Sequence, residues 1–280
     1  DKPFTTIGAS FDMNVPVGIQ ENDKFGVGVQ FFSDKGGSTV FSTNSIAITG
    51  AFHKAMDLNK VNYLSAGLQI GLAQRSINFE NLTFNDQFDG VTGYTLTTSE
   101  DLPVNTFGYA DISTGLFWTS SPEKRTNFHA GIAAHHVNLP DVSFSDEEID
   151  RLSMSFAFHT GAQFPVGRRV DMLPRLLTYF QGTQFEMNIV TNFRYLLTQL
   201  NGSSFYVGAW ARPVKDVETS LALDAIVLLA AIEIEGVRFG LSIDANVSQL
   251  RSSSAGFGAM EFSVAYTGQD DTKVVICPTF

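Results

Sequence analysis

A two-residue alternation of apolar and small or polar residues runs through most of this chain. Within Phe25 to Phe31 and Leu64 to Leu72, every second residue is apolar and the residues between them are Gly, Gln or Ser. Successive side chains on a strand point to opposite faces, so each segment predicts a strand with one apolar and one polar face. A sheet built from such strands needs two different solvents. Lipid outside and water inside a closed barrel would supply them.

Composition agrees with a membrane barrel. Charged residues make up 17% of the chain, below the roughly 25% of ordinary soluble domains, while aromatic residues reach 12% and include 25 Phe. The charges gather in short segments such as Glu123 to Arg125 and Asp146 to Asp150. No apolar run approaches the roughly 18 residues that a membrane-spanning helix needs. We therefore expect strands to do any spanning.

Alternation and turn residues together predict about thirteen strands. Pro174 interrupts one of them, and Asp224 to Ile232 is apolar on both faces, which also fits a buried helix. The predicted strands are Thr5 to Val15, Phe25 to Phe32, Phe41 to Phe52, Val61 to Ala73, Phe107 to Trp118, Phe128 to His136, Leu152 to Phe164, Met172 to Phe180, Phe185 to Leu196, Phe205 to Arg212, Leu221 to Glu235, Val237 to Val247 and Met260 to Tyr266.

The connections between these strands fall into two classes. The turns at 53–60, 119–126, 165–170, 197–202 and 234–236 lie at one edge of the sheet, and the longer connections at 74–104, 137–150 and 248–257 lie at the other. Outer-membrane barrels have short periplasmic turns and longer extracellular loops, so the second edge is predicted to be extracellular. This arrangement starts the first strand outside, and one additional upstream strand would give an even total of about 14.

We find no linker or abrupt change in composition, so we expect residues 1–280 to form a single outer-membrane β-barrel domain with a short periplasmic tail at 269–280. The predicted fold class is all-β, a transmembrane antiparallel β-barrel, located in the bacterial outer membrane. The net charge of −11 argues against a nucleic-acid partner. Cys277 is the single cysteine, and its role in the tail stays open between a free thiol and attachment to a neighbour.

Several stretches, taken in order, resemble one known family. These stretches are Phe25 to Phe31, Leu68 to Gly71, Asp86 to Asp89, Phe128 to Ile132 before Pro140, Phe239 to Leu250 and Cys277 to Phe280. Together they resemble the PorP/SprF proteins, outer-membrane components of the type IX secretion and gliding machinery of the Bacteroidetes. The family often has Tyr at the position of Ile243, and that position is predicted to face lipid.

The resemblance implies a non-enzymatic barrel without a cofactor. It would help to secrete or retain proteins that carry a type IX C-terminal signal domain, including filamentous adhesins. It further implies a secreted cargo protein or adhesin as partner at the cell surface and a peptidoglycan-linked lipoprotein or ring below. The residues by themselves support an outer-membrane barrel with elaborated outer loops, with lipid as its other partner.

Two sets of polar residues fall on the inward face of the predicted barrel. His129, His135 and His159 lie on neighbouring strands, where a hydrated lining role is favoured over a metal site because no Cys, Asp or Glu stands at ligand spacing. The second set would either set the selectivity of a channel or keep a plugged interior solvated, and we favour the structural role. Its members are Glu186, Asn188, Arg194, Arg238, Asp244 and Glu261.

The two longest outer connections carry the predicted partner-binding residues. The connection from Arg75 to Val104 mixes aromatic and acidic or amide residues, as binding surfaces do, although the same aromatics could fold the loop down as a lid. Asp141 to Asp150 is acidic enough to hold calcium but lacks the spacing of a defined calcium loop, so a solvated loop is favoured. The predicted partner-binding residues are Phe79, Phe84, Phe88, Asp89, Tyr94, Asp141 and Phe144.

No paired nucleophile and base and no phosphate-binding loop stand out, so we expect no enzymatic activity. Three functional classes are compatible with the sequence. A secretion-linked anchor or cargo receptor is the favoured one. A passive or hydrophobic-solute channel would have an open lumen. A soluble propeller or sandwich is disfavoured because almost every strand has an apolar outward face. The sequence does not name the cargo.

Overall fold

A computed structural model describes residues 4–15, 23–37, 41–79, 82–145, 149–197, 203–215, 221–248 and 257–268 of the chain. The predicted tail at 269–280 with Cys277, most of the connection at 248–257, and Asp146, Glu147 and Glu148 of the acidic loop lie outside these ranges. Within the described residues, no helix has the length and apolar character needed to cross a membrane.

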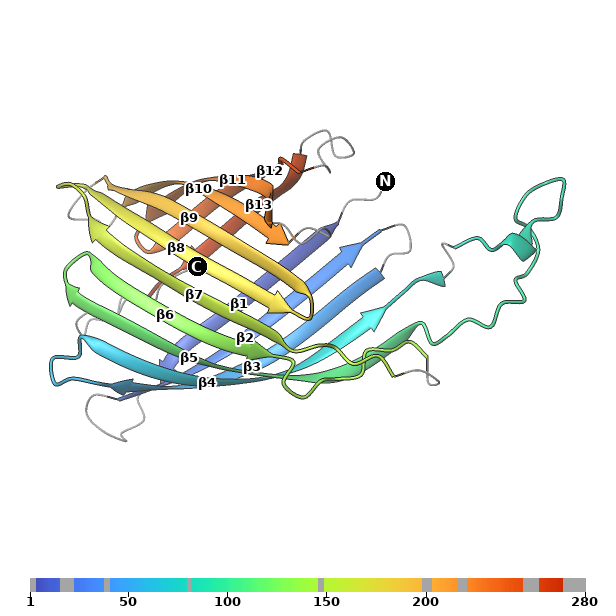
Figure 1. Cartoon of the computed structure of the whole chain (residues 1–280), viewed down its shortest axis with the longest axis horizontal. Helices are drawn as coiled ribbons and strands as arrows, with labels where there is room; N and C mark the ends of the chain where they lie inside the picture. The colour runs from blue at the N-terminus through green and yellow to red at the C-terminus, as the bar shows by residue number, and fades with distance from the viewer. Residues whose placement is uncertain are drawn as a thin grey trace. The chain divides into compact units, whose positions relative to one another are not determined.

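Most of the described chain is β-strand (Figure 1). A short 3₁₀ helix, η2 (Asn85–Gln87), lies in the connection between the fourth and fifth strands. The strands are β1 (Thr5–Val15), β2 (Lys24–Gly36), β3 (Phe41–Ala55), β4 (Asn62–Ser76), β5 (Thr106–Glu123), β6 (Thr126–His135), β7 (Ser155–Pro165), β8 (Val170–Gln181), β9 (Gln184–Leu196), β10 (Ser204–Lys215), β11 (Leu221–Ile234), β12 (Val237–Asn246) and β13 (Phe257–Tyr266).

Each strand pairs with the one that follows it in sequence. The order in the sheet runs from β1 to β13 without a crossover, which is the pattern of a meander. The β1–β2 hairpin is antiparallel and pairs Thr5 with Lys35 at one end and Val15 with Phe25 at the other. Because neighbouring strands are antiparallel, successive connections alternate between the two edges of the sheet, as the sequence predicts. The single sheet excludes the two-sheet sandwich for the described residues.

Contacts divide the chain into two compact units. Unit 1 comprises Asp1–His53, Ser65–Gly115 and Ala134–Met154, and it holds β1, β2, most of β3 and β4 and the first half of β5. Unit 2 comprises Lys54–Leu64, Leu116–Ala133 and Ser155–Phe280, and it holds the remainder of β5, most of β6 and all later strands.

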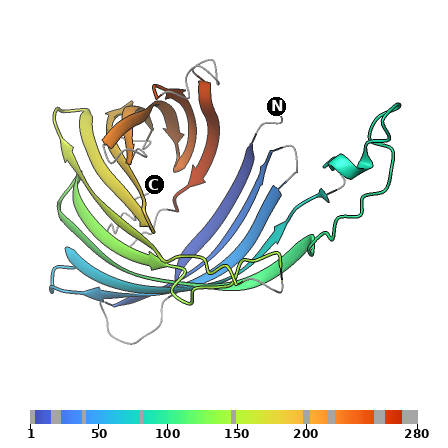
Figure 2. The ribbon, with the colours of Figure 1, turned by 45° about the vertical axis from the view of Figure 1, so that its right-hand side comes forward.

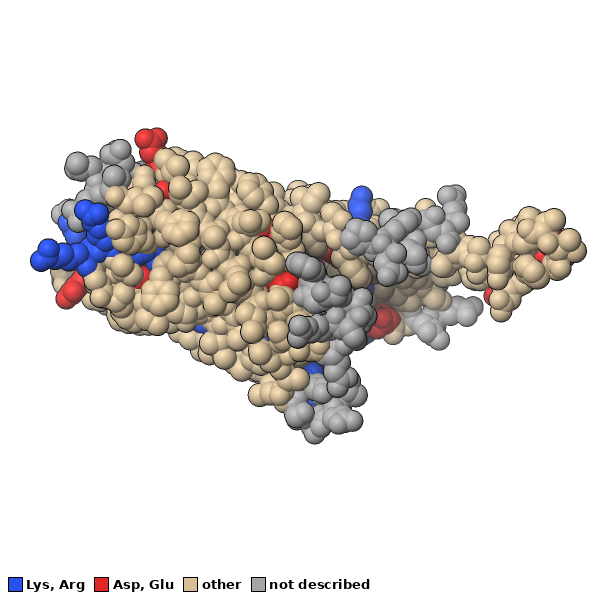
Figure 3. Space-filling view, turned by 90° about the horizontal axis from the view of Figure 1, so that it is seen from above, with Lys and Arg blue, Asp and Glu red and all other residues tan. Residues whose placement is uncertain are grey.

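In both units the large apolar side chains are exposed and the polar ones are covered. Leu72 in unit 1 is 65% exposed and Leu228 in unit 2 is 60% exposed, whereas Ser242 and Asp244 on the other face of β12 are buried. Figure 3 shows one face on which most described side chains are neither basic nor acidic. We call the two sides of the sheet the apolar face and the polar face. This distribution is the reverse of that in a soluble sheet and suits an apolar face in lipid.

The predicted strands are confirmed, with some corrections of extent. The turn predicted at 119–126 is too long, because β5 continues to Glu123 and β6 begins at Thr126, which leaves Lys124 and Arg125 as the turn. The predicted connections 74–104 and 137–150 are residues 77–105 and 136–154 in the structure. The buried-helix alternative for Asp224 to Ile232 is wrong, since β11 pairs along its length with β10 and β12.

Two prolines lie inside strands and disturb the pairing there. Opposite Pro174, the β7–β8 register passes from Gly161 paired with Arg175 directly to Phe164 paired with Met172. At Pro213 the β10–β11 register shifts, which marks a bulge. Proline has no backbone N–H to donate to the neighbouring strand, so an irregularity at each position is expected.

Glycines on the polar face make room for large polar side chains from neighbouring strands. A Cβ added at Gly131 would lie 2.4 Å from Nε2 of His159, and one added at Gly161 would lie 2.6 Å from Nε2 of His129. Gly26 has the same relation to His53, at 2.9 Å. These glycines therefore leave space for imidazole rings from the adjoining strands, which is one reason why Gly often alternates with the apolar positions.

We predict that Gly161→Ala lowers the free energy of unfolding by about 1–3 kcal/mol, because the methyl group would displace the ring of His129. Urea titration of the protein in detergent, followed by tryptophan fluorescence, measures the effect. Gly8→Ala is the matched control, since its Cβ would meet nothing closer than 4.0 Å. The double variant Gly161→Ala/His129→Ala should recover part of the loss; a loss that persists unchanged in the double variant contradicts the packing argument.

Candidate functional site

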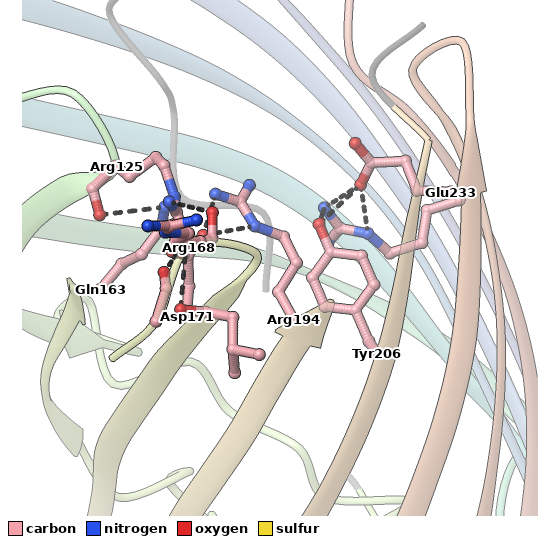
Figure 4. A network of polar contacts seen from close by, with 10 residues as sticks. Arg125, Gln163, Arg168, Asp171, Arg194, Tyr206 and Glu233 are labelled. Carbon is pink, nitrogen blue, oxygen red and sulfur yellow. Dashed lines mark hydrogen bonds and ion pairs between the residues drawn. The ribbon is translucent and has the colours of Figure 1, made fainter. Parts of the chain in front are cut away.

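The polar face of unit 2 carries a network of arginines and carboxylates with Asp171 at its centre (Figure 4). The Asp171 side chain is 0% exposed, and each of its oxygens accepts from a different arginine. Arg125 Nε donates to Oδ1 at 2.7 Å, and Arg194 Nε donates to Oδ2 at 2.8 Å. A carboxylate removed from water in this way is favourable only when both oxygens are paired, and two guanidinium groups satisfy this condition.

Arg125 reaches Asp171 from an unusual backbone conformation. It is the second residue of the β5–β6 turn and has a φ of 65°, which costs a residue with a Cβ about 1–2 kcal/mol. Its guanidinium also donates to the carbonyl oxygens of Gly167, Arg168 and Val170 at 3.0–3.1 Å. These charge-assisted bonds offset the strain, since each contributes about 1.5–3 kcal/mol. Arg125 therefore fastens the β7–β8 turn to the β5–β6 turn.

Two further clusters of the same kind lie farther along the sheet. Glu233 accepts from the hydroxyl of Tyr206 at 2.9 Å and from Nε of Arg238 at 2.9 Å, and the Arg238 guanidinium lies 4.5 Å from the centre of the Tyr206 ring. Arg212 donates to Asp224 at 3.1 Å and to Asp244 at 2.7 Å. Each cluster joins two or three strands through charges that are paired on the polar face.

The predicted polar-face residues are thus placed where the alternation puts them. Arg194, Arg238 and Asp244 belong to the three clusters, Glu186 accepts from Asn188 at 2.8 Å, and Glu261 is exposed opposite Ser242. Sequence reasoning missed their partners, which are Arg125, Asp171, Tyr206, Arg212, Asp224 and Glu233. Glu233 and Arg212 continue the polar-face rows of their strands, so stricter counting of parity would have found them. Asp171 lies between the predicted turn at 165–170 and the predicted strand Met172 to Phe180, so no face of the sheet was assigned to it.

The polar face of unit 1 contains a hollow of about 240 Å³. Its lining mixes polar and apolar residues from β2, β3, β4 and β5, with His136 at one side. Within it Gln69 donates to Gln30 at 3.2 Å, and Nδ1 of His136 lies 2.9 Å from a carboxylate oxygen of Asp111. These amide and imidazole groups keep this part of the polar face hydrated.

The three predicted histidines do not form one site. His129 and His159 lie together in unit 2 against Phe117, with ring centres 5.9 Å apart. His135 belongs to unit 1, where a hydrogen bond of 3.1 Å joins its Nδ1 to Ser113. Among the residues that the structure describes, no three His, Cys, Asp or Glu side chains gather as a metal-binding group.

The connection between β4 and β5 carries an ordered tip that extends from the strands of unit 1 (Figure 2). Asp89 organises it, because its carboxylate accepts from the hydroxyls of Thr92 and Thr95 and from the backbone N–H groups of Val91, Thr92 and Gly93. Gly90 and Gly93 supply the positive φ angles of 83° and 121° that this turn requires.

The turn brings aromatic and aliphatic side chains together. Phe88 and Tyr94 form a β-bridge and their rings lie 5.4 Å apart. Val91 is 90% exposed, and Leu96 is also exposed. We call Phe88, Val91, Tyr94 and Leu96 the tip surface. It is an exposed apolar surface supported by the hydrogen bonds of Asp89 rather than by a core.

A second carboxylate supports the base of the tip. Asp86, in η2, accepts from the backbone N–H of Ser99 at 2.6 Å and from the hydroxyls of Thr98 and Ser99. The backbone N–H of Ser99 is the main cause of a pKa for Asp86 below its usual range. For Asp89, the hydroxyl of Thr92 and then the backbone N–H of Val91 hold the pKa well below its usual range. Both groups are therefore ionised at neutral pH.

The remaining predicted partner-binding residues lie elsewhere in unit 1. Phe84 donates its backbone N–H to the side chain of Gln87, and Phe79 lies at the start of the connection, where its carbonyl accepts from Leu82. Asp141 accepts from the backbone N–H groups of Ser143 and Asp150.

Phe144 is half-buried against aromatic rings of two strands. Its ring lies 4.7 Å from that of Phe107 on β5 and 6.2 Å from that of Phe41 on β3. It therefore holds the 136–154 connection against β3 and β5. The contacts of the described residues join Phe88, Asp89 and Tyr94 into one group but leave Asp141 and Phe144 apart from it.

The family model described as "Type IX secretion system membrane protein PorP/SprF" matches residues 1–266. This chain belongs to the PorP/SprF family. The resemblance, the all-β barrel fold class and the outer-membrane location predicted from the sequence are thereby confirmed, and the protein is a membrane component of the type IX secretion system.

No curated protein matches this PorP/SprF chain. Among solved structures, a bacterial polysaccharide outer membrane secretin is similar, with 9% sequence identity and a TM-score of 0.40 over 92% of this chain and 87% of the other.

For this PorP/SprF protein we predict that Asp171→Asn lowers the free energy of unfolding by about 3–5 kcal/mol, because Arg125 and Arg194 lose their shared buried anion. Urea titration in detergent measures the loss. Asp224→Asn is the matched control: Arg212 keeps its bond to Asp244, so the loss should be clearly smaller. Equal losses in the two variants would contradict a central role for Asp171.

The ionised form of Asp89 should hold the tip together. Its folded-state pKa lies below the unfolded value of about 4, so the stabilisation is complete above pH 4 and is lost only as the pH falls through the lower folded value. We predict unchanged resistance of the tip to chymotrypsin between pH 7 and pH 5, and several-fold faster cleavage at pH 7 in Asp89→Asn. The control is Asp101→Asn in the same connection, which should be cleaved like the unsubstituted protein.

Proposed function

We propose that this PorP/SprF protein is a non-enzymatic barrel that binds or anchors a secreted protein at the cell surface through its β4–β5 connection. The partner would carry a type IX C-terminal signal domain or be an adhesin of the gliding machinery. Below the membrane, a peptidoglycan-linked lipoprotein would be a further partner. Family membership supports the secretion role, and the tip surface supports the place of contact.

The observation that carries the proposal is the organisation of the tip surface. Its exposed apolar side chains stand on a turn that Asp89 fixes through five hydrogen bonds. A fixed surface loses little conformational freedom when a partner binds, which favours affinity. Large exposed apolar side chains beside polar groups are typical of interaction sites.

The charge of the connection indicates the chemistry of the partner. Residues 77–105 contain five acidic residues and neither Lys nor Arg. Long loops of outer-membrane barrels face the outside, so this acidic apolar surface would meet proteins at the cell surface. A complementary partner would present apolar side chains surrounded by Lys or Arg, because opposite charges steer association.

We predict that Val91→Ser/Tyr94→Ala reduces the amount of secreted protein that copurifies with the barrel in mild detergent by at least about tenfold, because two contact side chains are each expected to contribute about 1 kcal/mol or more. Quantitative mass spectrometry of the purified complex measures this. The control is Leu58→Ser, because Leu58 is 91% exposed in the β3–β4 turn, at the other edge of the sheet.

Equal recovery of the partner from both variants would exclude the tip surface as the contact. If no secreted protein copurifies and the purified protein conducts ions in planar bilayers, the alternative of a passive or hydrophobic-solute channel would replace the proposal.

A further inference from the structure

Five arginines extend over the polar face of unit 2, and four of them hold a carboxylate. Arg125 and Arg194 share Asp171, Arg212 contacts Asp224 and Asp244, and Arg238 contacts Glu233. The fifth is Arg175, in the middle of β8. No hydrogen bond or ion pair reaches its guanidinium within the part of the chain that the structure describes.

Residues of the two neighbouring strands define the position of Arg175. It pairs with Gly161 on β7 and with Val190 on β9, and its side chain leans over the glycine. A Cβ at Gly161 would lie 3.1 Å from Cγ of Arg175 and 2.6 Å from Nε2 of His129. The absence of a side chain at Gly161 therefore lets the aliphatic stem of Arg175 and the imidazole of His129 approach the same place from two different strands, close enough for the charge of Arg175 to act on His129.

His129 is also incompletely satisfied. Its Nδ1 is buried and has no hydrogen-bond partner among the described residues. A buried ring nitrogen without a partner is uncommon, and each case needs an explanation such as a bound ion or ligand. The ring that carries this nitrogen thus meets the side chain of Arg175 beside Gly161.

The electrostatic surroundings of Arg175 are positive. Arg238, Tyr206 and His129 are close enough to interact electrostatically with it. Arg125, Arg175, Arg194 and Arg238 together carry more positive charge than the two carboxylates named above, Asp171 and Glu233, can balance. An oxyanion placed beside Arg175 would neutralise part of this excess and would accept the hydrogen bonds that the guanidinium fork can donate.

We propose that Arg175 is the centre of an anion-binding site on the polar face of unit 2, with His129 and Arg238 beside it. The ligand is a carboxylate or phosphate group, which a guanidinium binds through two parallel hydrogen bonds. An acidic side chain of a polypeptide and a phosphorylated small molecule share this chemistry. The site is independent of the tip surface, which lies in unit 1.

The test uses the full chain purified in a non-ionic detergent, with citrate and pyrophosphate as probes measured by isothermal titration calorimetry at low salt. We expect saturable binding of at least one probe, with at least tenfold weaker affinity in Arg175→Gln. Arg212→Gln is the matched control, since that arginine is paired with two carboxylates away from the site, and it should bind like the unsubstituted protein. A higher affinity for citrate would indicate a carboxylate ligand, and a higher affinity for pyrophosphate would indicate a phosphate ligand.

Several results would overturn the proposal. The first is that neither probe binds the unsubstituted protein saturably. The second is that Arg175→Gln binds the probes with the affinity of the unsubstituted protein. The third is that Arg175→Gln and Arg212→Gln lose the same amount of affinity. If Arg175→Gln does not fold, Arg175→Lys decides: it keeps the charge but loses the planar fork, so weaker binding is expected and unchanged binding contradicts the proposed geometry.

Discussion

The structure depends on one constraint: every backbone N–H and C=O in an apolar solvent must find its partner within the protein. A meander of neighbouring antiparallel strands meets this need with the shortest connections, since each strand bonds to the one before and the one after. Once the ladder is complete, the alternation of side chains divides the sheet into an apolar and a polar face. The exposed Leu72 and the covered Ser242 are two results of the same backbone geometry.

The polar face has its own packing problem, because large polar side chains from adjacent strands compete for space. At several positions a glycine makes the room, as at Gly131 for His159 and at Gly161 for His129. Arginines then join strands that are distant in sequence through shared carboxylates. Asp171, held by Arg125 and Arg194, connects a turn and two strands at the turn edge of unit 2.

Much of the fold could be predicted because its signal is local. A period of two residues is visible within any one strand, so the strand positions and the polar faces of β9 and β12 follow from the sequence alone. The pairing of charges could not be predicted in the same way. Arg125 and Asp171 are 46 residues apart, and their contact depends on the registers and the turn that place them together. The two-residue turn of Lys124 and Arg125 also depends on that contact, because the bonds of the Arg125 side chain offset the cost of its positive φ.

The predicted partner-binding residues show the same division between local and distant causes. Asp89 lies within six residues of every group that bonds to its carboxylate, so the causes of this turn are as local as those of a strand. Phe144 lies in a polar loop sequence that is typical of the surface. Its ring is nevertheless covered by Phe41 and Phe107, which come from strands distant in sequence. Composition cannot separate an aromatic that awaits a partner from one that already has one. What distinguishes Phe88 and Tyr94 is that the bonds of Asp89 support the backbone beneath them while their rings stay exposed.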